Sequence, residues 1–228
     1  FRAGSQIAAP RRLSSADVAL LAAMNVPEVP VHRAPDVALI ATGDELVMPG
    51  DTPGPDQIIA SNSFGLATLL RDLGATPRLL PIARDSKAAL NTVLDLAEGA
   101  DLIVTIGGAS VGDHDLVGAV AAERGLERSF YKVAMRPGKP LMAGRMGETV
   151  LVGLPGNPVS AMVCGHVFLA PVIRRLQGLK AAPMPRSTAP LAVSLEKNGP
   201  REHYMRATLN AGHLSPDPRQ DSSLLSVL

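Results

Sequence analysis

Short apolar runs alternate with helix-like segments through the middle of the chain. The runs are rich in Val, Ile and Leu, whereas apolar residues recur every three or four positions in the segments between them. A chain that alternates strand and helix forms a mostly parallel sheet with helices on both faces. We therefore predict an α/β domain over residues 35–179. Its strands and helices are expected, in chain order, at 37–42, 64–74, 77–83, 86–99, 101–108, 116–125, 129–135, 141–145, 149–154 and 157–178.

Different patterns flank this domain. Residues 1–34 contain one helix, which Ser14 or Ser15 can cap, and we interpret them as the remnant of a preceding domain and its linker. Residues 180–190 form a proline-rich linker. Beyond it, residues 191–197 and 203–209 alternate in polarity on either side of NGPRE, which is typical of a turn, and the two segments predict a hairpin. The segment 180–228 is thus expected to be a small, incomplete β-domain.

Composition excludes several classes of function. Hydrophobic residues make up 46% of the chain and charged residues 19%, which is typical of a globular protein and too apolar for disorder. A net charge of +1, 3% aromatic residues and no Trp argue against a nucleic-acid surface. The longest apolar stretch, 161–173, is too short to span a bilayer and contains His166 and Pro171, so no membrane partner is expected.

Cys164 is the only cysteine, and it lies within an apolar stretch. It therefore predicts a buried small hydrophobic residue, and no disulfide framework or cysteine zinc cluster can be built from it within one chain. Residues 1–30 lack the pattern of a signal peptide, and a cytoplasmic location is expected.

Polar motifs follow the predicted strands. In parallel sheets, ligands bind beyond the carboxyl ends of the strands, so motifs at these positions should gather along one rim. The motifs are GDEL (43–46), RDS (84–86), GGASVGDHD (107–115) and LPGNP (154–158).

The glycine-rich motif permits two interpretations. Its glycines let the backbone approach an anionic ligand, and the next helix offers a positive N-terminus. Alternatively, it is a glycine turn in which Asp113 or Asp115 caps that helix. The residues alone leave both open.

Charged residues near the rim are equally ambiguous one at a time. Arg136 and Lys139 flank a Pro-Gly turn and form either an oxyanion clamp or a solvated charged turn. Pro158 can start a helix whose free N–H groups bind an anion, or it can belong to a rigid turn. Carboxylates that follow successive strands suggest magnesium held partly through a phosphate substrate, although any one of them could be a cap or a surface charge.

The ordered set TGDEL, SNS, GGASVGDHD, RPGKP and LPGNPVSA resembles the molybdopterin molybdenumtransferase (MoeA) family, to which the gephyrin E domain is related. The resemblance covers nearly the whole chain. It implies a central molybdopterin-binding α/β fold followed by a β-domain, in a homodimeric enzyme of molybdenum cofactor biosynthesis. Such an enzyme inserts molybdenum from molybdate into adenylylated molybdopterin and releases AMP with the help of Mg²⁺. Molybdopterin adenylyltransferase and apo-molybdoenzymes are its expected protein partners.

The resemblance also assigns residues, motif by motif. Glu45, Asp85 and Asp115 match acidic positions with catalytic and metal-binding roles, and Lys139 matches a catalytic basic position. Arg136 stands where many members have lysine, and Arg206 and Ser222 match positions linked to molybdate. The implied substrate-binding residues are Asp44, Asn62, Gly107, Gly108, Ser110, Gly112, Arg136, Pro155, Asn157, Pro158, Arg206 and Ser222.

Two alternatives to the molybdenum-inserting enzyme follow from the same resemblance. A molybdopterin adenylyltransferase shares the α/β domain and the glycine loop, but LPGNP followed by a linker and β-domain argues against it. A non-catalytic scaffold of the gephyrin type need not keep Glu45, Asp85 and Asp115, which are all present. Because the N-terminal region and the end of the β-domain are expected to be missing, this chain by itself is expected to lack full activity.

Overall fold

A six-stranded sheet forms the centre of the protein. The computed structural model describes residues 4–108 and 115–228. The strand order is β4-β1-β5-β9-β8-β6, in which β4, β1, β5 and β9 are parallel and β8 runs antiparallel to both of its neighbours. The predicted mostly parallel α/β sheet is therefore confirmed. The strands are β1 (Asp36–Ala41), β4 (Thr76–Leu79), β5 (Leu102–Ile106), β6 (Glu127–Tyr131), β8 (Met142–Met146) and β9 (Thr149–Leu154).

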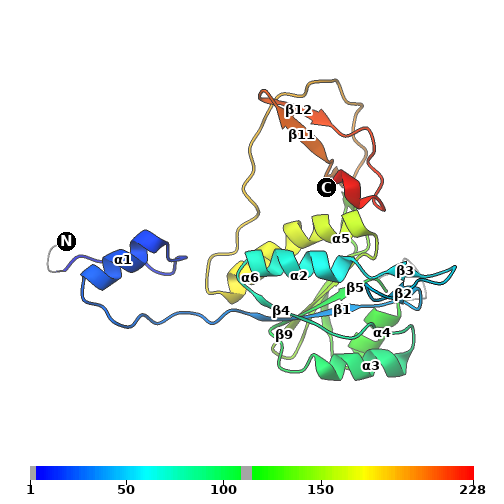
Figure 1. Cartoon of the computed structure of the whole chain (residues 1–228), viewed down its shortest axis with the longest axis horizontal. Helices are drawn as coiled ribbons and strands as arrows, with labels where there is room; N and C mark the ends of the chain where they lie inside the picture. Colours follow the sequence, from blue (N-terminus) through cyan, green and yellow to red (C-terminus); the bar gives the residue numbers. More distant parts are fainter. Residues whose placement is uncertain (1–3, 109–114) are drawn as a thin grey trace.

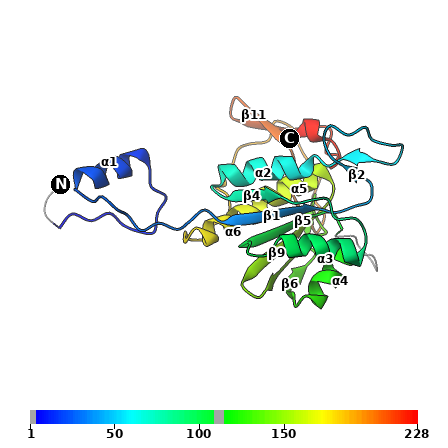
Figure 2. The ribbon, with the colours of Figure 1, turned by 60° about the horizontal axis from the view of Figure 1, so that its bottom comes forward.

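Helices cover both faces of this sheet. Helices α2 (Asn62–Asp72), α5 (Pro158–Cys164) and α6 (Ala170–Leu176) lie on one face, and α3 (Lys87–Leu96) and α4 (Leu116–Glu123) lie on the other (Figures 1 and 2). Strand β1 shows why helices pack on both faces of the sheet. Leu39 belongs to one buried cluster and Ile40 to the other, because successive strand residues point to opposite faces. Two apolar cores therefore hold the sheet between them.

The predicted long helix is interrupted by a π-helical segment. The segment η1 (Gly165–Leu169) separates α5 from α6 and ends two residues before Pro171, which has no N–H to donate to the preceding turn. The whole helical span 158–176 has a mean hydropathy of 1.4 over an 18-residue window, enough by length and composition to cross a membrane. However, Cys164, Leu169 and Ile173 are fully buried against the sheet, which identifies it as a core helix.

The hairpin predicted for the C-terminal segment is wrong. Residues 191–197 form no strand, and only Leu191 bridges to Leu214. The observed hairpin joins β11 (Ala207–Asn210) to β12 (His213–Pro216) through Ala211 (φ 47°) and Gly212 (φ 79°). Two consecutive positive φ angles match the twist of a two-residue hairpin turn, so Ala-Gly rather than NGPRE marks the turn.

Three short strand pairs complete the fold. Strand β10 (Glu202–His203) pairs in parallel with β7 (Met135–Arg136), so the C-terminal segment is hydrogen-bonded to the α/β domain. Strands β2 (Leu46–Val47) and β3 (Ile58–Ile59) pair beside the end of β1 and flank the proline-rich loop 48–57. The hairpin β11–β12 stands above α5 (Figure 1).

The N-terminal helix lies apart from the sheet. Helix α1 (Ser15–Ala23) begins at the predicted Ser14 cap, which forms a reciprocal capping box with Asp17. An extended segment connects it to β1 (Figure 1). Where this segment enters the sheet, Arg33 pairs with Asp101, and the Asp101 carboxylate also accepts the N–H of Asp36 at 2.8 Å.

Gly138 is a sensitive position because it is packed against Cys164 of the core helix. It is buried with φ 101°, and a Cβ there would lie 2.3 Å from Cys164 Sγ. We expect Gly138→Ala to lower the free energy of unfolding by about 2–4 kcal/mol, because it combines overpacking with an unfavourable φ. Gly147→Ala is the control, since Gly147 has φ 56° but no heavy atom within 4 Å of the added carbon. Equal losses for both variants in urea denaturation would contradict the packing argument.

Candidate functional site

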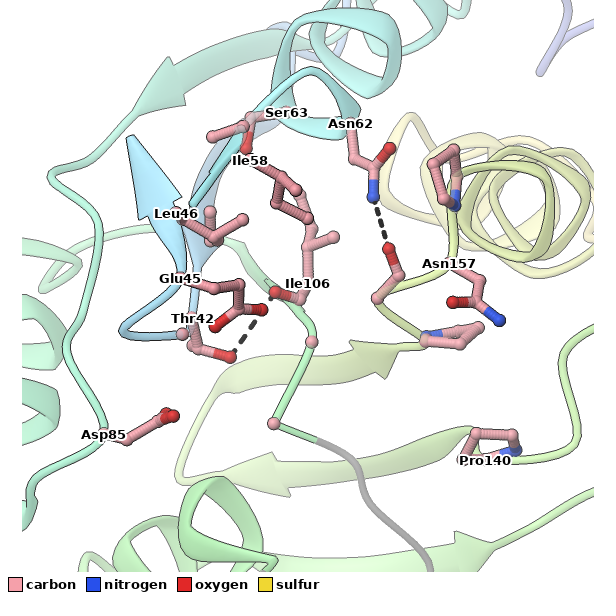
Figure 3. Close-up of a pocket in the computed structure, with 18 of the residues that line it drawn as sticks. Thr42, Glu45, Leu46, Ile58, Asn62, Ser63, Asp85, Ile106, Pro140 and Asn157 are labelled. Carbon is pink, nitrogen blue, oxygen red and sulfur yellow. Dashed lines mark hydrogen bonds between the residues drawn. The ribbon is translucent and has the colours of Figure 1, made fainter. Parts of the chain in front are cut away.

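A large cleft opens where the parallel strands β1, β5 and β9 end (Figure 3). Its volume is about 1490 Å³, which exceeds the roughly 300–1,000 Å³ of a typical small-ligand site. All four predicted rim motifs contribute to it, as expected for the carboxyl edge of a parallel sheet. Of the predicted site residues, those that line the cleft are Glu45, Asn62, Asp85, Gly107, Gly108, Asp115, Lys139, Pro155, Asn157 and Pro158.

Two carboxylates point into the cleft from neighbouring strand ends. Figure 3 shows Glu45, which follows β1, and Asp85, which follows the bridge between Thr42 and Ala83. The Glu45 side chain folds back over Gly43, where an added Cβ would lie 2.3 Å from Glu45 Oε2. Gly43 also has φ 144°, so the position of the Glu45 carboxylate depends on a glycine there.

Asp115 lines the same cleft and also caps a helix. Its Oδ1 accepts the N–H of Gly118 at 2.8 Å, which makes it the N-cap of α4. The capping interpretation is therefore correct as a description of the local structure, and it does not remove the carboxylate from the cleft. Within residues 4–108 and 115–228, no three His, Cys, Asp or Glu side chains gather closely enough to hold a metal ion. Glu45, Asp85 and Asp115 thus share a cleft without forming a closed metal cage.

The start of α5 forms the opposite wall. Asn62, at the start of α2, donates from Nδ2 to the carbonyl of Gly156 at 2.7 Å and fixes the loop before the helix (Figure 3). The backbone N–H groups at the start of α5 were expected to be free to bind an anion. Some hydrogen-bonding groups there are instead bonded to the C-terminal segment. The Val159 N–H donates to the carbonyl of Ser222 at 3.0 Å, and Asn157 Nδ2 donates to Ser222 Oγ at 3.0 Å. Ser222 therefore joins the C-terminal segment to the α5 start and does not itself line the cleft.

The remaining predicted residues fall into two groups. Ser110 and Gly112 lie outside the described residues. Asp44 and Arg136 do not line the cleft. Asp44 Oδ1 accepts the N–H of Asp85 at 3.0 Å, and Arg136 Nη2 donates to Asn198 Oδ1 at 3.1 Å because β7 is paired with β10. Arg136 and Lys139 therefore do not form the expected oxyanion clamp, because only Lys139 lines the cleft.

Arg136 belongs instead to a group of cations around His203. We name Arg136, Arg201, His203 and Arg206 the cationic cluster. Arg206 does not line the cleft either, but its Nη2 donates to the carbonyl of Asp221 at 3.2 Å, directly before Ser222. Its Nε and Nη1 atoms are buried and have no hydrogen-bond partner among residues 4–108 and 115–228. A buried guanidinium with unpaired donors is costly unless an acceptor joins it, so the cluster is suited to bind an oxyanion.

The pKa of His203 lies below its ordinary value. Burial is the main cause, and the charges of Arg136, Arg206 and Arg201 add to it. The folded protein therefore favours the neutral imidazole, whereas the unfolded chain takes up a proton near its ordinary pKa of 6.5. We expect the free energy of unfolding to fall as the pH drops from about 6.5 towards the lowered pKa of folded His203. In this range the unfolded chain binds more protons at His203 than the folded protein does.

The matched variant for this pH effect is His203→Gln, which cannot titrate. Urea denaturation between about pH 5 and pH 8 should show a smaller decline for the variant than for the wild type. Identical pH profiles for the two proteins would show that His203 does not contribute.

Several lining residues were not predicted. Leu46 and Ile58 come from the short β2–β3 pair and give the cleft an apolar wall, and Ser223 and Leu225 come from the C-terminal segment (Figure 3 shows the first two). Thr42, at the end of β1, donates to the Ile106 carbonyl at 3.4 Å. The one available sequence signal was the apolar pair of Ile58 and Ile59 shortly before SNS, because Ser223 and Leu225 lie far away in the sequence.

Comparison with known proteins agrees with this geometry. A family model described as a probable molybdopterin binding domain matches residues 38–175, more than half of the chain. The chain belongs to the MoeA family. Among curated relatives, a molybdopterin molybdenumtransferase from Nostoc is 38% identical over 221 residues. A molybdopterin molybdenumtransferase 2 from Mycobacterium tuberculosis is 39% identical over 206 residues.

The alignments with these MoeA relatives cover 92% and 87% of the chain but only 50% of each relative. The chain thus spans about half the length of the curated relatives that it matches. A crystal structure of a molybdopterin biosynthesis MoeA protein from Pyrococcus horikoshii has a TM-score of 0.77 and 30% identity, covering 92% of this chain and 51% of that one. The predicted family and fold are both confirmed.

Proposed function

We propose that the protein takes part in molybdenum cofactor biosynthesis by inserting molybdenum from molybdate into adenylylated molybdopterin, with release of AMP. The observation that carries this proposal is the convergence of Glu45, Asp85, Asp115 and Lys139 on one large cleft at the carboxyl edge of the sheet. Family membership supports the pathway, and the cleft supports a substrate larger than a typical small ligand.

The substrate is proposed to span two kinds of surface. The apolar wall that includes Leu46 and Ile58 suits the flat pterin, whereas Gly107, Gly108 and Lys139 suit the phosphate groups. Gly107 and Gly108 both have positive φ angles, and a Cβ on Gly108 would lie 2.5 Å from Val117 Cγ2, so the packing of this loop against α4 requires glycine there. Asn62 keeps the opposite loop in place through Gly156.

Magnesium is consistent with the donor chemistry of the cleft. Mg²⁺ prefers oxygen ligands and commonly takes only one or two carboxylates, with substrate phosphates and water completing its shell. Glu45, Asp85 and Asp115 offer such oxygens, and the lack of a three-residue cage among the described residues fits this mode of binding. When bound, Mg²⁺ would neutralise charge on the departing AMP phosphate.

Molybdate is proposed to bind at the cationic cluster. Molybdate is a tetrahedral dianion, and the unpaired Nε and Nη1 of Arg206 are charged donors with no partner in the described structure. Ser222 follows the Asp221 carbonyl that Arg206 holds, and it contacts Asn157 of the cleft wall. Arg136 and Arg206 both act electrostatically on His203, so both lie near it.

We propose that no covalent enzyme intermediate forms. The only thiol, that of Cys164, is fully buried, and burial raises its pKa to about 12, so the thiolate is not available as a nucleophile. We propose that the chain comprises an N-terminal segment (1–34), the molybdopterin-binding domain (35–179) and a β-domain (180–228), in a cytoplasmic homodimer. Molybdopterin adenylyltransferase and apo-molybdoenzymes are the proposed protein partners.

Reconstitution tests the proposed reaction directly. The protein is given adenylylated molybdopterin, molybdate and Mg²⁺, and both released AMP and molybdenum bound to the dithiolene are measured. We expect the two products in equal amounts. Consumption of ATP with plain molybdopterin would instead identify an adenylyltransferase, and the absence of both reactions would support a non-catalytic scaffold.

A further inference from the structure

We infer that Arg84 is a positioning residue that holds the Glu45 and Asp85 carboxylates in register at the cleft. The inference rests on the proposed function and assigns a role to a residue that does not line the cleft. Arg84 immediately follows Ala83, which bridges in parallel to Thr42 at the end of β1. It is therefore located between the two loops that carry the carboxylates.

One guanidinium nitrogen of Arg84 holds the loop after β1. Arg84 Nη1 donates to the carbonyl of Asp44 at 2.8 Å and to that of Leu46 at 3.1 Å, with the carbonyl of Gly43 at 3.5 Å. These acceptors lie on both sides of Glu45 in the sequence. A single charged group thus fixes the backbone on either side of a carboxylate in the proposed site.

Two further hydrogen bonds tie the same segments together. The Gly43 N–H donates to the Ala83 carbonyl at 3.1 Å, and the Asp85 N–H donates to Asp44 Oδ1 at 3.0 Å. The second bond places the backbone of Asp85 directly against the loop that carries Glu45. The relative position of the two carboxylates is therefore set by contacts between residues 43–46 and 83–85.

The contacts of Arg84 favour this role over substrate binding. Its Nη1 donates to backbone carbonyls, and no described carboxylate forms an ion pair with the guanidinium. The loop that it holds is exposed at Asp44 and Glu45, so its freed carbonyls would be solvated by water. Loss of Arg84 is thus expected to cost little stability, whereas a misplacement of catalytic groups by about 1 Å can lower a rate by about 100-fold.

The variants are Arg84→Ala and Arg84→Lys, with Arg124→Ala as the matched control. Arg124 also links two elements, donating to Asn91 Oδ1 at 3.0 Å and to Asp95 Oδ1 at 2.7 Å, but it lies between α4 and α3 and outside the cleft. Lysine at position 84 keeps the charge and can reach at least one carbonyl, so it should restore part of the function.

For Arg84→Ala we expect kcat to fall by about 10–100-fold, with KM for adenylylated molybdopterin changed by less than about threefold. The concentration of Mn²⁺ needed for half-maximal binding, followed by electron paramagnetic resonance, should rise, and amide hydrogen exchange at residues 43–46 should quicken. Arg84→Lys should recover part of kcat, and Arg124→Ala should leave kcat and this exchange unchanged.

The inference is overturned if residues 43–46 exchange at the wild-type rate in Arg84→Ala, or if kcat is unchanged in that variant. It is also overturned if kcat falls only in proportion to the fraction of unfolded protein. A wild-type protein that releases no AMP would instead refute the proposed function. The exchange measurement would then still decide whether Arg84 holds the loop.

Discussion

Replacing Asp115 with Asn should lower the rate of AMP release by about 100-fold or more and leave the free energy of unfolding within about 0.5 kcal/mol of the wild type. Asn caps helices about as well as Asp, so the bond from Gly118 N–H to the side-chain oxygen is retained. What is lost is the negative charge in the cleft. The expected effect therefore separates the two functions of this residue.

Asp115→Ala is the companion variant, because it removes the cap as well as the charge. It should lose as much activity as Asp115→Asn and, in addition, about 0.5–2 kcal/mol of stability. The measurements are AMP release under saturating substrate and urea denaturation. If Asp115→Asn loses stability and activity together, or keeps wild-type activity, Asp115 is only a cap.

Arg206→Ala should weaken molybdate binding by about 10–100-fold, which corresponds to the loss of about 1.5–3 kcal/mol from hydrogen bonds to a charged group. Its Nε and Nη1 are buried donors that lack a partner in the part of the chain that the structure describes. The backbone of Arg206 is held independently, since its N–H and its carbonyl are both bonded to the Gln220 side chain. The variant should therefore keep the local fold. Isothermal titration with molybdate measures the dissociation constant.

Arg186→Ala is the control for general charge. Arg186 pairs with Glu202 of β10, and its side chain is 68% exposed. Arg186→Ala therefore changes the net charge by the same amount as Arg206→Ala, without affecting the buried Nε and Nη1 of Arg206. Arg206→Ala should also raise the pKa of His203, because the Arg206 charge lowers it in the wild type. Equal weakening of molybdate binding in both variants would show that the site is not built on Arg206.

The sheet, its helices and most of the cleft could be predicted from sequence because local signals suffice for them. Apolar runs such as 101–108 stop at glycines, and the carboxyl ends of parallel strands lie on one rim whatever the details of packing. Glu45, Asp85 and Lys139 follow from this rule, since each lies just after a strand or turn at that edge.

Residues whose position depends on long-range pairing could not be predicted. Arg136 and Lys139 are three positions apart, yet the pairing of Arg136 with His203 in the β7–β10 ladder turns it away from the cleft. No local pattern reveals that pairing. The C-terminal hairpin was missed for a related reason, because alternation in 191–197 gave no information about whether a partner strand was available.

Arg84 shows a second limit. Its side chain acts through backbone carbonyls of residues about 40 positions earlier, at 2.8–3.5 Å, and carbonyls have no residue-specific signature. The sequence does place RDS directly after a strand, which marks Asp85 as a rim residue. It contains nothing that distinguishes the arginine beside it from a solvated surface charge.

The contact between Ser222 and the start of α5 has a thermodynamic consequence. Ser222 accepts from Val159 N–H and Asn157 Nδ2, so these two bonds determine how firmly the C-terminal segment is docked on the cleft wall. A ligand that favours docking from one side lowers the cost of docking for a ligand on the other side. Linkage requires the two affinities to change by the same factor, whichever ligand arrives first. Oxyanion and pterin binding would then be mutually reinforcing events with no fixed order.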